Sequence, residues 1–264
     1  KFIPFGKPDF TNKEIEAITK VMESGWIGMG EETIKFEKEL SNYLQAPEVV
    51  TVNSCTSALF LSLLVEGVGN DDEVIVPSLT WYASSNVIIY LGAKPVFCDV
   101  EENTMCSNLS SILKKITHKT KAIVVVHYGG YAIDIDYLRK NIPRNISIIE
   151  DSAHAFGSKY PNGKNVGSSQ NSVCFSFYAN KNLSTGEGGA IALFDKEKAD
   201  RLRILRNNGL EKNAWKRYQD IKKTYSNKVY ELGYKMNLTD LQSSIGLVQL
   251  RRIKKMNLKR TEII

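Results

Sequence analysis

Two charged side chains lie where an α/β protein concentrates its chemistry. Asp151 ends an apolar run over residues 146–150 that predicts a buried strand, and open α/β sheets bind ligands just beyond the carboxyl ends of strands. Lys181 precedes a stretch that becomes glycine-rich towards Gly189. Pyridoxal phosphate (PLP) needs a lysine amine that forms a Schiff base with its aldehyde and a carboxylate that keeps its ring nitrogen protonated. Asp151 and Lys181 together therefore predict a PLP enzyme, whereas Lys181 alone is typical of a solvated loop.

Hydroxyl side chains supply a candidate phosphate site. Thr56 and Ser57 begin a predicted helix, where free backbone N–H groups and the positive end of the helix dipole attract an anion. Ser176, at the end of another predicted strand, is placed to complete this site. An ordinary Ser/Thr N-cap is the alternative interpretation of Thr56 and Ser57.

Two larger side chains are candidates for contacts with the cofactor ring. Trp81 follows a predicted strand and has a flat face suited to stacking on an aromatic ring, with a core tryptophan as the alternative. His154 lies three residues after Asp151, within reach of a phenolic oxygen, although a lone histidine is often a hydrogen-bonded structural residue.

The elements that must position these residues alternate along the chain. Thr11 is the predicted N-cap of a first helix, and the second helix has Ile34, Phe36, Leu40 and Leu44 as its apolar positions. Strand–helix repetition then predicts a mainly parallel sheet covered on both faces. The predicted strands are 49–52, 73–76, 95–98, 122–126, 146–150, 172–175 and 190–193. The predicted helices are 12–24, 31–44, 56–66, 82–91, 108–116, 134–140, 196–206 and 237–252, with an excursion over 210–231.

Composition narrows the class of protein. The 264 residues are 42% hydrophobic and carry a net charge of +6, which fits a globular protein with an anionic small substrate better than a nucleic-acid binder. No uncharged apolar run reaches about 18 residues and the N-terminal residues lack a secretory signal, so we expect a cytoplasmic protein without a membrane partner. The four cysteines have neither CxxC spacing nor paired histidines, so we expect no metal site and no disulfide framework.

A series of motifs extends these observations over nearly the whole chain. They are Ile3-Pro-Phe-Gly6, Ser24-Gly-Trp-Ile27, Asn53-Ser-Cys-Thr-Ser-Ala-Leu59, Pro77-Ser-Leu-Thr-Trp81, Gly92-Ala-Lys-Pro-Val-Phe-Cys-Asp99, Glu150-Asp-Ser-Ala-His-Ala-Phe-Gly157, Ser176-Phe-Tyr-Ala-Asn-Lys-Asn-Leu-Ser-Thr-Gly-Glu-Gly-Gly189 and Gly233-Tyr-Lys-Met-Asn-Leu-Thr-Asp-Leu-Gln242. In these motifs the chain closely resembles the DegT/DnrJ/EryC1/StrS family of sugar aminotransferases.

The resemblance implies a fold and a set of site residues. The fold is that of PLP-dependent transferases of type I (aspartate aminotransferase-like), here an α/β large domain with a mainly parallel seven-stranded sheet and helices on both faces. The implied site consists of the catalytic Lys181 and Asp151, Trp81 on the ring face, His154 near the phenolic oxygen, and Thr56, Ser57 and Ser176 on the phosphate. The resemblance also implies a homodimer with shared active sites, in which Asn237 reaches the phosphate of the partner's cofactor.

The same resemblance implies a domain organisation. Residues 1–30 form an N-terminal arm and helix, and residues 31–240 form the PLP-binding large domain. Residues 241–264 form a helix leading to a C-terminal small domain, and because relatives continue beyond Ile264 we expect most of that domain to be absent from this chain. One departure from the family pattern is Asn208, where relatives often carry a histidine.

The implied activity is ping-pong transamination of a nucleotide-linked keto sugar with glutamate as the amino donor. Its product is an amino sugar for a surface polysaccharide, a glycan or a secondary metabolite. Residues 233–240 and 213–217 are similar to the branch that acts on 4-keto sugars. The alternatives are a PLP-dependent sugar dehydratase, whose lysine is replaced by histidine, and a non-catalytic PLP-fold regulator. A nucleotide-binding protein without PLP is disfavoured because no Gly-x-Gly-x-x-Gly or Walker loop follows the first strand.

Overall fold

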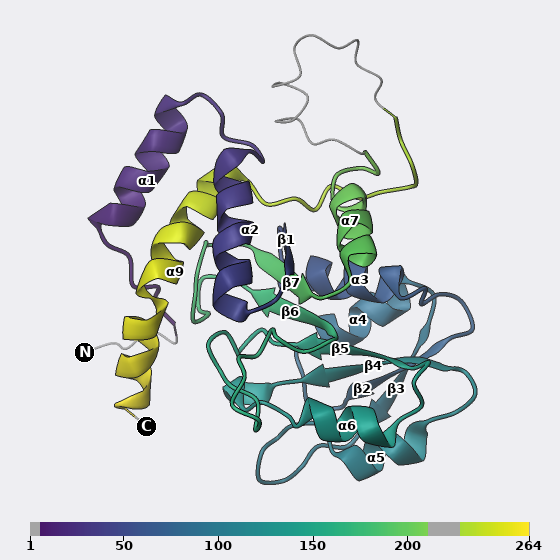
Figure 1. Ribbon diagram of the computed structural model, residues 1–264. Helices are drawn as coiled ribbons and strands as arrows, with labels where there is room; N and C mark the ends of the chain where they lie inside the picture. Colours follow the sequence, from purple (N-terminus) through teal and green to yellow (C-terminus); the bar gives the residue numbers. More distant parts are fainter. Residues whose placement is uncertain (1–5, 211–227, 264) are drawn as a thin grey trace.

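The computed structural model describes residues 6–210 and 228–263 and has the predicted strand–helix alternation (Figure 1). The strands are β1 (Glu48–Val52), β2 (Glu73–Pro77), β3 (Lys94–Cys98), β4 (Thr120–Val126), β5 (Ser147–Asp151), β6 (Ser172–Ser176) and β7 (Gly189–Leu193). The helices are α1 (Asn12–Glu23), α2 (Glu31–Leu44), α3 (Cys55–Val65), α4 (Ala83–Tyr90), α5 (Leu109–Lys115), α6 (Ile135–Asn141), α7 (Lys196–Leu205) and α9 (Asp240–Thr261), with a 3-10 turn over Tyr128–Gly130. None of the described helices is both long enough and apolar enough to cross a lipid bilayer.

The strands form one seven-stranded sheet, as predicted, and their order is β1-β7-β6-β5-β4-β2-β3. Neighbours from β6 through β3 run parallel, and β7 runs antiparallel to both β6 and β1. In the β6–β7 ladder Ser176 pairs with Gly189. The loop that carries Lys181 therefore leaves and rejoins the sheet at the same edge, which is the edge formed by the carboxyl ends of the parallel strands.

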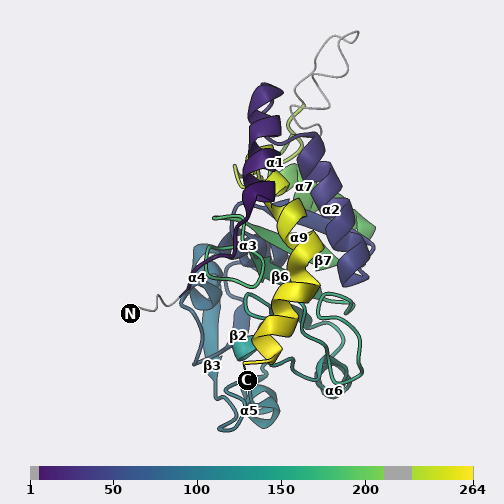
Figure 2. The same cartoon turned by 90° about the vertical axis from the view of Figure 1, so that its left-hand side faces the viewer.

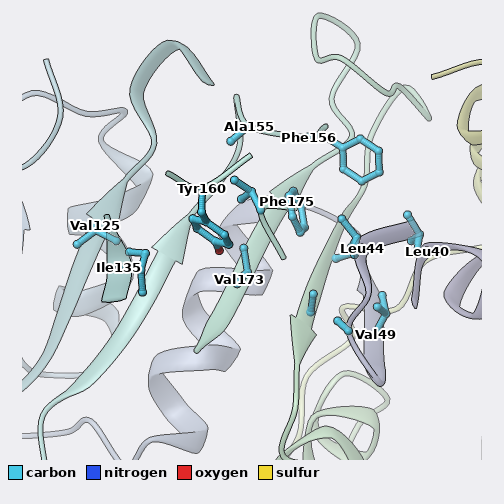
Figure 3. Close-up of a cluster of buried hydrophobic side chains, with 14 of the residues drawn as sticks. Leu40, Leu44, Val49, Val125, Ile135, Ala155, Phe156, Tyr160, Val173 and Phe175 are labelled. Atoms are coloured by element: carbon cyan, nitrogen blue, oxygen red, sulfur yellow. The ribbon is translucent and has the colours of Figure 1, made fainter. Parts of the chain in front are cut away.

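Two helical layers cover the sheet because neighbouring strand residues point to opposite faces. On β1, Val49 belongs to the buried cluster under α2, α5, α6 and α9, whereas Val50 belongs to the cluster under α3, α4 and α7. Part of the first cluster is drawn in Figure 3, which labels Val125 of β4, Val173 and Phe175 of β6, and Leu40 and Leu44 of α2. The architecture is therefore a three-layer α/β sandwich, as predicted.

The prediction for the apolar face of α2 was wrong at one residue. Phe36, Leu40 and Leu44 are fully buried, but Ile34 is 42% exposed. Two residues along a helix are separated by about 200°, so Ile34 points away from the face that holds Phe36. The spacing of Phe36, Leu40 and Leu44, each four residues apart, marks the buried face.

The first two helices begin with caps of different origin. Thr11 is the N-cap of α1, as predicted, and it also forms a capping box with Glu14. Gly30 at the N-cap of α2 has no side chain, and the carboxylate of Asp240 takes over this role. Asp240 accepts hydrogen bonds from the amides of Gly30 (2.7 Å) and Thr33 (3.0 Å) and from the Thr33 hydroxyl (2.7 Å).

The last helix differs from its predicted bounds of 237–252. It begins at Asp240, where Thr239 and Gln242 form a capping box, and continues to Thr261 because Ile253 and Met256 extend its buried face. Figures 1 and 2 show α9 lying beside α1 and α2 on one side of the molecule. Asn237 therefore precedes the helix. The proposed domain division at residue 240 stays a prediction.

Candidate active site

A cavity of about 600 Å³ lies at the carboxyl ends of the parallel strands. Its size is within the range of small-molecule sites, about 300–1,000 Å³. The lining comes from the β1–α3 turn, the β2–α4 loop, the ends of β4, β5 and β6, and the loop before β7. Six of the eight predicted site residues line it: Thr56, Trp81, Asp151, His154, Ser176 and Lys181.

Asp151 is the last residue of β5 and faces this cavity at 6% exposure. Each of its carboxylate oxygens accepts one hydrogen bond from the protein. Ser84 Oγ donates to Oδ2 at 2.8 Å and the Ala153 amide donates to Oδ1 at 3.2 Å. A carboxylate oxygen can accept more than one hydrogen bond, so Asp151 can still accept one from a bound ligand.

Lys181 is half-buried in the β6–β7 loop and lines the same cavity. Its amide donates to the Tyr178 carbonyl at 3.0 Å, which forms a turn at the end of β6. Burial lowers the pKa of the Lys181 amine below its ordinary value and outweighs the opposing attraction of Asp151. A larger fraction of the amine is therefore neutral, the form that acts as a nucleophile or a base.

Trp81 and His154 border the open side of the cavity. Trp81 is 67% exposed, which rules out the alternative of a core tryptophan, and its ring lies 4.3 Å from that of Tyr82. His154 is exposed, and its ring makes an edge contact with Tyr128. Protein atoms around the ring partly exclude water from it, and this desolvation, followed by the nearby charge of Lys181, lowers the pKa of His154 against the attraction of Asp151. The imidazole is therefore biased towards its neutral form.

The turn between β1 and α3 has the character of an anion site. Ser54 is the N-cap of α3, and its side chain accepts from the Ser57 amide. The amides before Ser57 in this first turn have no intrahelical acceptor, because they begin the helix. Thr56 is exposed in this first turn. Gly189 allows β7 to approach closely, because a Cβ there would lie 2.8 Å from the Cys55 amide nitrogen. One end of the cavity is thus lined by the first turn of α3, by Thr56 and by Ser176, which pairs with Gly189 in the β6–β7 ladder.

Two predicted phosphate ligands are not in the cavity lining. Ser57 is 7% exposed, and its hydroxyl donates to Asn53 Oδ1 at 2.6 Å. The N-cap of α3 is Ser54, so neither Thr56 nor Ser57 is the cap. Asn237 donates from Nδ2 to the Leu238 carbonyl at 3.1 Å, and its buried Oδ1 has no partner among the described residues. Their roles towards a phosphate stay predictions.

The chain matches the DegT/DnrJ/EryC1/StrS aminotransferase family over residues 8–264. It belongs to this family. The spore coat polysaccharide biosynthesis protein SpsC of Bacillus subtilis is 42% identical over 263 residues, covering 99% of this chain and 67% of SpsC.

Solved structures of similar proteins share the fold. Spr1654 from Streptococcus pneumoniae in its PMP form has a TM-score of 0.92 and 36% identity over 99% of this chain and 70% of that chain. Its PLP form has a TM-score of 0.87 and 34% identity over 96% and 67%. DesV of S. venezuelae, in complex with a ketimine intermediate, has a TM-score of 0.83 and 34% identity over 92% and 62%.

PLP is the cofactor of this DegT/DnrJ/EryC1/StrS protein. The cavity fits that molecule in charge and in the types of its polar groups. A buried carboxylate, Asp151, suits a protonated ring nitrogen, and the open amides of α3 suit a phosphate. Lys181, with its lowered pKa, lies in the same cavity to react with an aldehyde.

No role was predicted for the side chains that hold Asp151 and its neighbour Glu150. Ser84 of α4 is fully buried against Asp151. Glu150 is also fully buried, and its carboxylate accepts four hydrogen bonds. The donors are Ser169 Oγ at 2.5 Å, Tyr160 OH at 2.6 Å, His127 Nε2 at 2.8 Å and Asn171 Nδ2 at 2.8 Å. Glu150 and Asp151 were identified in the sequence as part of a motif, but the side chains that donate hydrogen bonds to them were not identified.

His127 joins this network to the cavity lining. The Ile133 amide donates to Nδ1 at 3.1 Å, so Nδ1 is an acceptor and the proton of a neutral ring is on Nε2, where it faces Glu150. Burial alone raises the pKa of Glu150, but the hydrogen bonds from His127 and the other donors outweigh it and place this pKa below its ordinary value.

The departure at Asn208 has a backbone explanation. Asn208 has φ of 59°, a left-handed conformation in which asparagine and histidine are both enriched. Its side chain is exposed and is not in the cavity lining. Residues 213–217, which were part of the 4-keto resemblance, lie outside the described residues.

Proposed function

We propose that this family member transfers an amino group from glutamate to a nucleotide-linked 4-keto sugar, as part of polysaccharide or glycan synthesis. The observation that carries the proposal is the placement of Lys181 and Asp151 in one cavity, with the Lys181 pKa lowered by burial. The name of SpsC, a spore coat polysaccharide biosynthesis protein, supports a polysaccharide product. PseC of Helicobacter pylori, 29% identical, is named as an aminotransferase in pseudoaminic acid biosynthesis and supports a sugar substrate.

The side chains have distinct proposed tasks. PLP, when bound, withdraws electrons from the carbon that carries the amino group. Lys181 holds the cofactor and, once released, takes and returns the proton at that carbon, for which a lowered pKa is an advantage. Asp151 accepts a hydrogen bond from the ring nitrogen and stabilises its positive charge. Neutral His154 donates to or accepts from the ring oxygen.

The rest of the cavity binds and orients. Thr56, Ser176 and the open amides of α3 hold the phosphate, and exposed Trp81 covers one ring face. The sugar nucleotide is an anion, and the net charge of +6 favours its approach. Asn237 serves the cofactor phosphate of a second subunit, so that each active site is built from two chains of a homodimer.

Borohydride reduction in the presence of PLP tests the cofactor site. We expect the cofactor to become attached to Lys181, as mapped by peptide mass spectrometry, and Lys181→Met to abolish labelling. Lys159→Met is the matched control, because Lys159 is exposed and its Nζ bonds to the Gly163 carbonyl outside the cavity. Attachment to another lysine would contradict the assignment.

Transamination itself is tested with glutamate and a panel of keto sugar nucleotides, followed by absorbance and by amino-sugar product. We expect 2-oxoglutarate and an amino sugar in equal amounts with a 4-keto substrate. Loss of water from the sugar without glutamate would indicate the dehydratase. Bound PLP that no amino donor converts would indicate the regulator.

A further inference from the structure

Among the residues that the structure describes, Ser84 makes the shorter of the two hydrogen bonds to the Asp151 carboxylate. Its hydroxyl is fully buried and lies 2.8 Å from Asp151 Oδ2. A second hydroxyl, Thr80 Oγ1, lies 2.9 Å from Ser84 Oγ. A carboxylate only accepts and a hydroxyl has a single proton, so Ser84 donates to Asp151 and Thr80 donates to Ser84. The three side chains form one directed chain of hydrogen bonds that ends on Asp151.

The same turn also carries Trp81. The Ser84 amide donates to the Trp81 carbonyl at 3.1 Å, which fixes these residues relative to each other at the start of α4. Trp81 extends into the cavity lining, while Ser84 points inward to Asp151. One turn therefore carries both an aromatic side chain of the cavity lining and a hydrogen-bond donor to the carboxylate of Asp151.

We propose that Ser84 is a positioning residue, which turns the Asp151 carboxylate towards the cavity and holds it in that orientation. This inference rests on the proposed function, in which Asp151 binds the cofactor ring nitrogen. With Ser84 on one oxygen and the Ala153 amide on the other, rotation of the carboxylate would break both hydrogen bonds. A carboxylate held in this orientation can accept a hydrogen bond from the ring nitrogen and favour the protonated form of that nitrogen.

The test uses Ser84→Ala with PLP labelled by nitrogen-15 in the ring. We expect the nitrogen resonance of the bound cofactor to move towards its unprotonated position and to titrate at lower pH. The kcat should fall about ten- to a hundred-fold, the range for losing one hydrogen bond to a charged group, while KM for the amino donor changes little. Ser84→Thr keeps the hydroxyl and should restore both the resonance and kcat.

Ser85→Ala is the matched control. Ser85 lies in the same turn, but its hydroxyl donates to the Tyr82 carbonyl at 3.0 Å, away from Asp151. This variant should keep the wild-type resonance and kcat. Thr80→Val, which removes the donor to Ser84 with little change in shape, should shift the resonance in the same direction by a smaller amount and covers the case in which Ser84→Ala does not fold.

The outcomes separate this inference from the proposed function. If the wild-type protein is not labelled by PLP at Lys181, the proposed function fails. If it is labelled and transaminates, but Ser84→Ala and Thr80→Val both keep the wild-type resonance and kcat, only the role of Ser84 is overturned. A fall in kcat with an unchanged nitrogen resonance would likewise overturn it, because a merely structural loss would not act through the ring nitrogen.

Discussion

Glu150 and Asp151 occupy the last two positions of β5, and their carboxylates lie on opposite faces of the sheet. Asp151 bonds to Ser84 of α4, whereas Glu150 bonds to Tyr160, which packs in the cluster under α2, α6 and α9. Successive residues of a strand alternate between faces, so two adjacent acids serve different purposes. One faces the cavity and the other fixes the structure behind it.

Glu150→Gln should lower the free energy of unfolding by about 3 kcal/mol, because an amide group would replace an oxygen that accepts from buried donors. Urea unfolding of the PLP-free protein measures this. Glu102→Gln, which alters an exposed side chain, is the control and should match the wild type.

The same carboxylate predicts part of the acid sensitivity. The pKa of Glu150 is lowered in the folded protein from an ordinary value of 4.5, so its contribution to stability is present above that value and is lost as pH falls through the folded pKa. Urea titrations at decreasing pH should show a shallower loss of stability in Glu150→Gln than in the wild type. Parallel pH profiles would contradict the prediction.

Lys181→Met should raise the pKa of His154. The positive charge of Lys181 disfavours the imidazolium, so removing it while Asp151 stays in place makes protonation easier. The chain has three histidines, which makes titration by NMR of the PLP-free protein practical, with His154→Gln to assign the resonance. An unchanged or lowered His154 pKa would show that the two side chains are not coupled.

Gly189→Ala should weaken PLP binding at least tenfold, about 1.4 kcal/mol. The added Cβ would lie 2.6 Å from the Ser54 carbonyl carbon and 2.8 Å from the Cys55 amide nitrogen, so the turn that offers its amides must move. Fluorescence or absorbance titration with PLP measures the affinity. Gly69→Ala, where a Cβ meets nothing within 4 Å, is the control for a general effect of the substitution.

Asp240→Ala should destabilise the protein by about 2 kcal/mol, the upper range for the loss of a helix N-cap. The variant leaves the amides of Gly30 and Thr33 without their acceptor at the start of α2. Thermal or urea unfolding checks this, and Asp240→Asn, which keeps one acceptor oxygen, should lose less. Equal stability of wild type and Asp240→Ala would show that solvent replaces the cap without cost.

Asn237→Ala should weaken PLP binding by about 1.5–3 kcal/mol if its carboxamide reaches the phosphate of the partner subunit. Light scattering measures the fraction of dimer, and PLP titration at several protein concentrations measures how the affinity for PLP depends on dimerisation. Affinity should rise with the dimer fraction in the wild type and lose that dependence in the variant. A monomer with tight PLP binding that Asn237→Ala leaves intact would refute the shared site.

Local patterns in the sequence were sufficient for the architecture and for the central pair. Short apolar runs between helical stretches predicted all seven strands, because strands covered on both faces are apolar along nearly their whole length. Asp151 and Lys181 were predicted as a pair because PLP needs a carboxylate and a lysine amine, and because Asp151 ends a predicted buried strand. Thr11 was predicted as a cap from its neighbours alone.

Contacts between distant residues were decided only by the tertiary structure. Ser84 and Asp151 are 67 residues apart, and Asp240 caps a helix whose first amide is 210 residues away. No local sequence pattern indicates such pairs, because the residue type of a hydroxyl or carboxylate does not depend on whether the side chain faces water or a buried partner. The size of Trp81 alone also allowed a position in the core. Its exposure in the folded protein shows that it lies in the cavity lining instead.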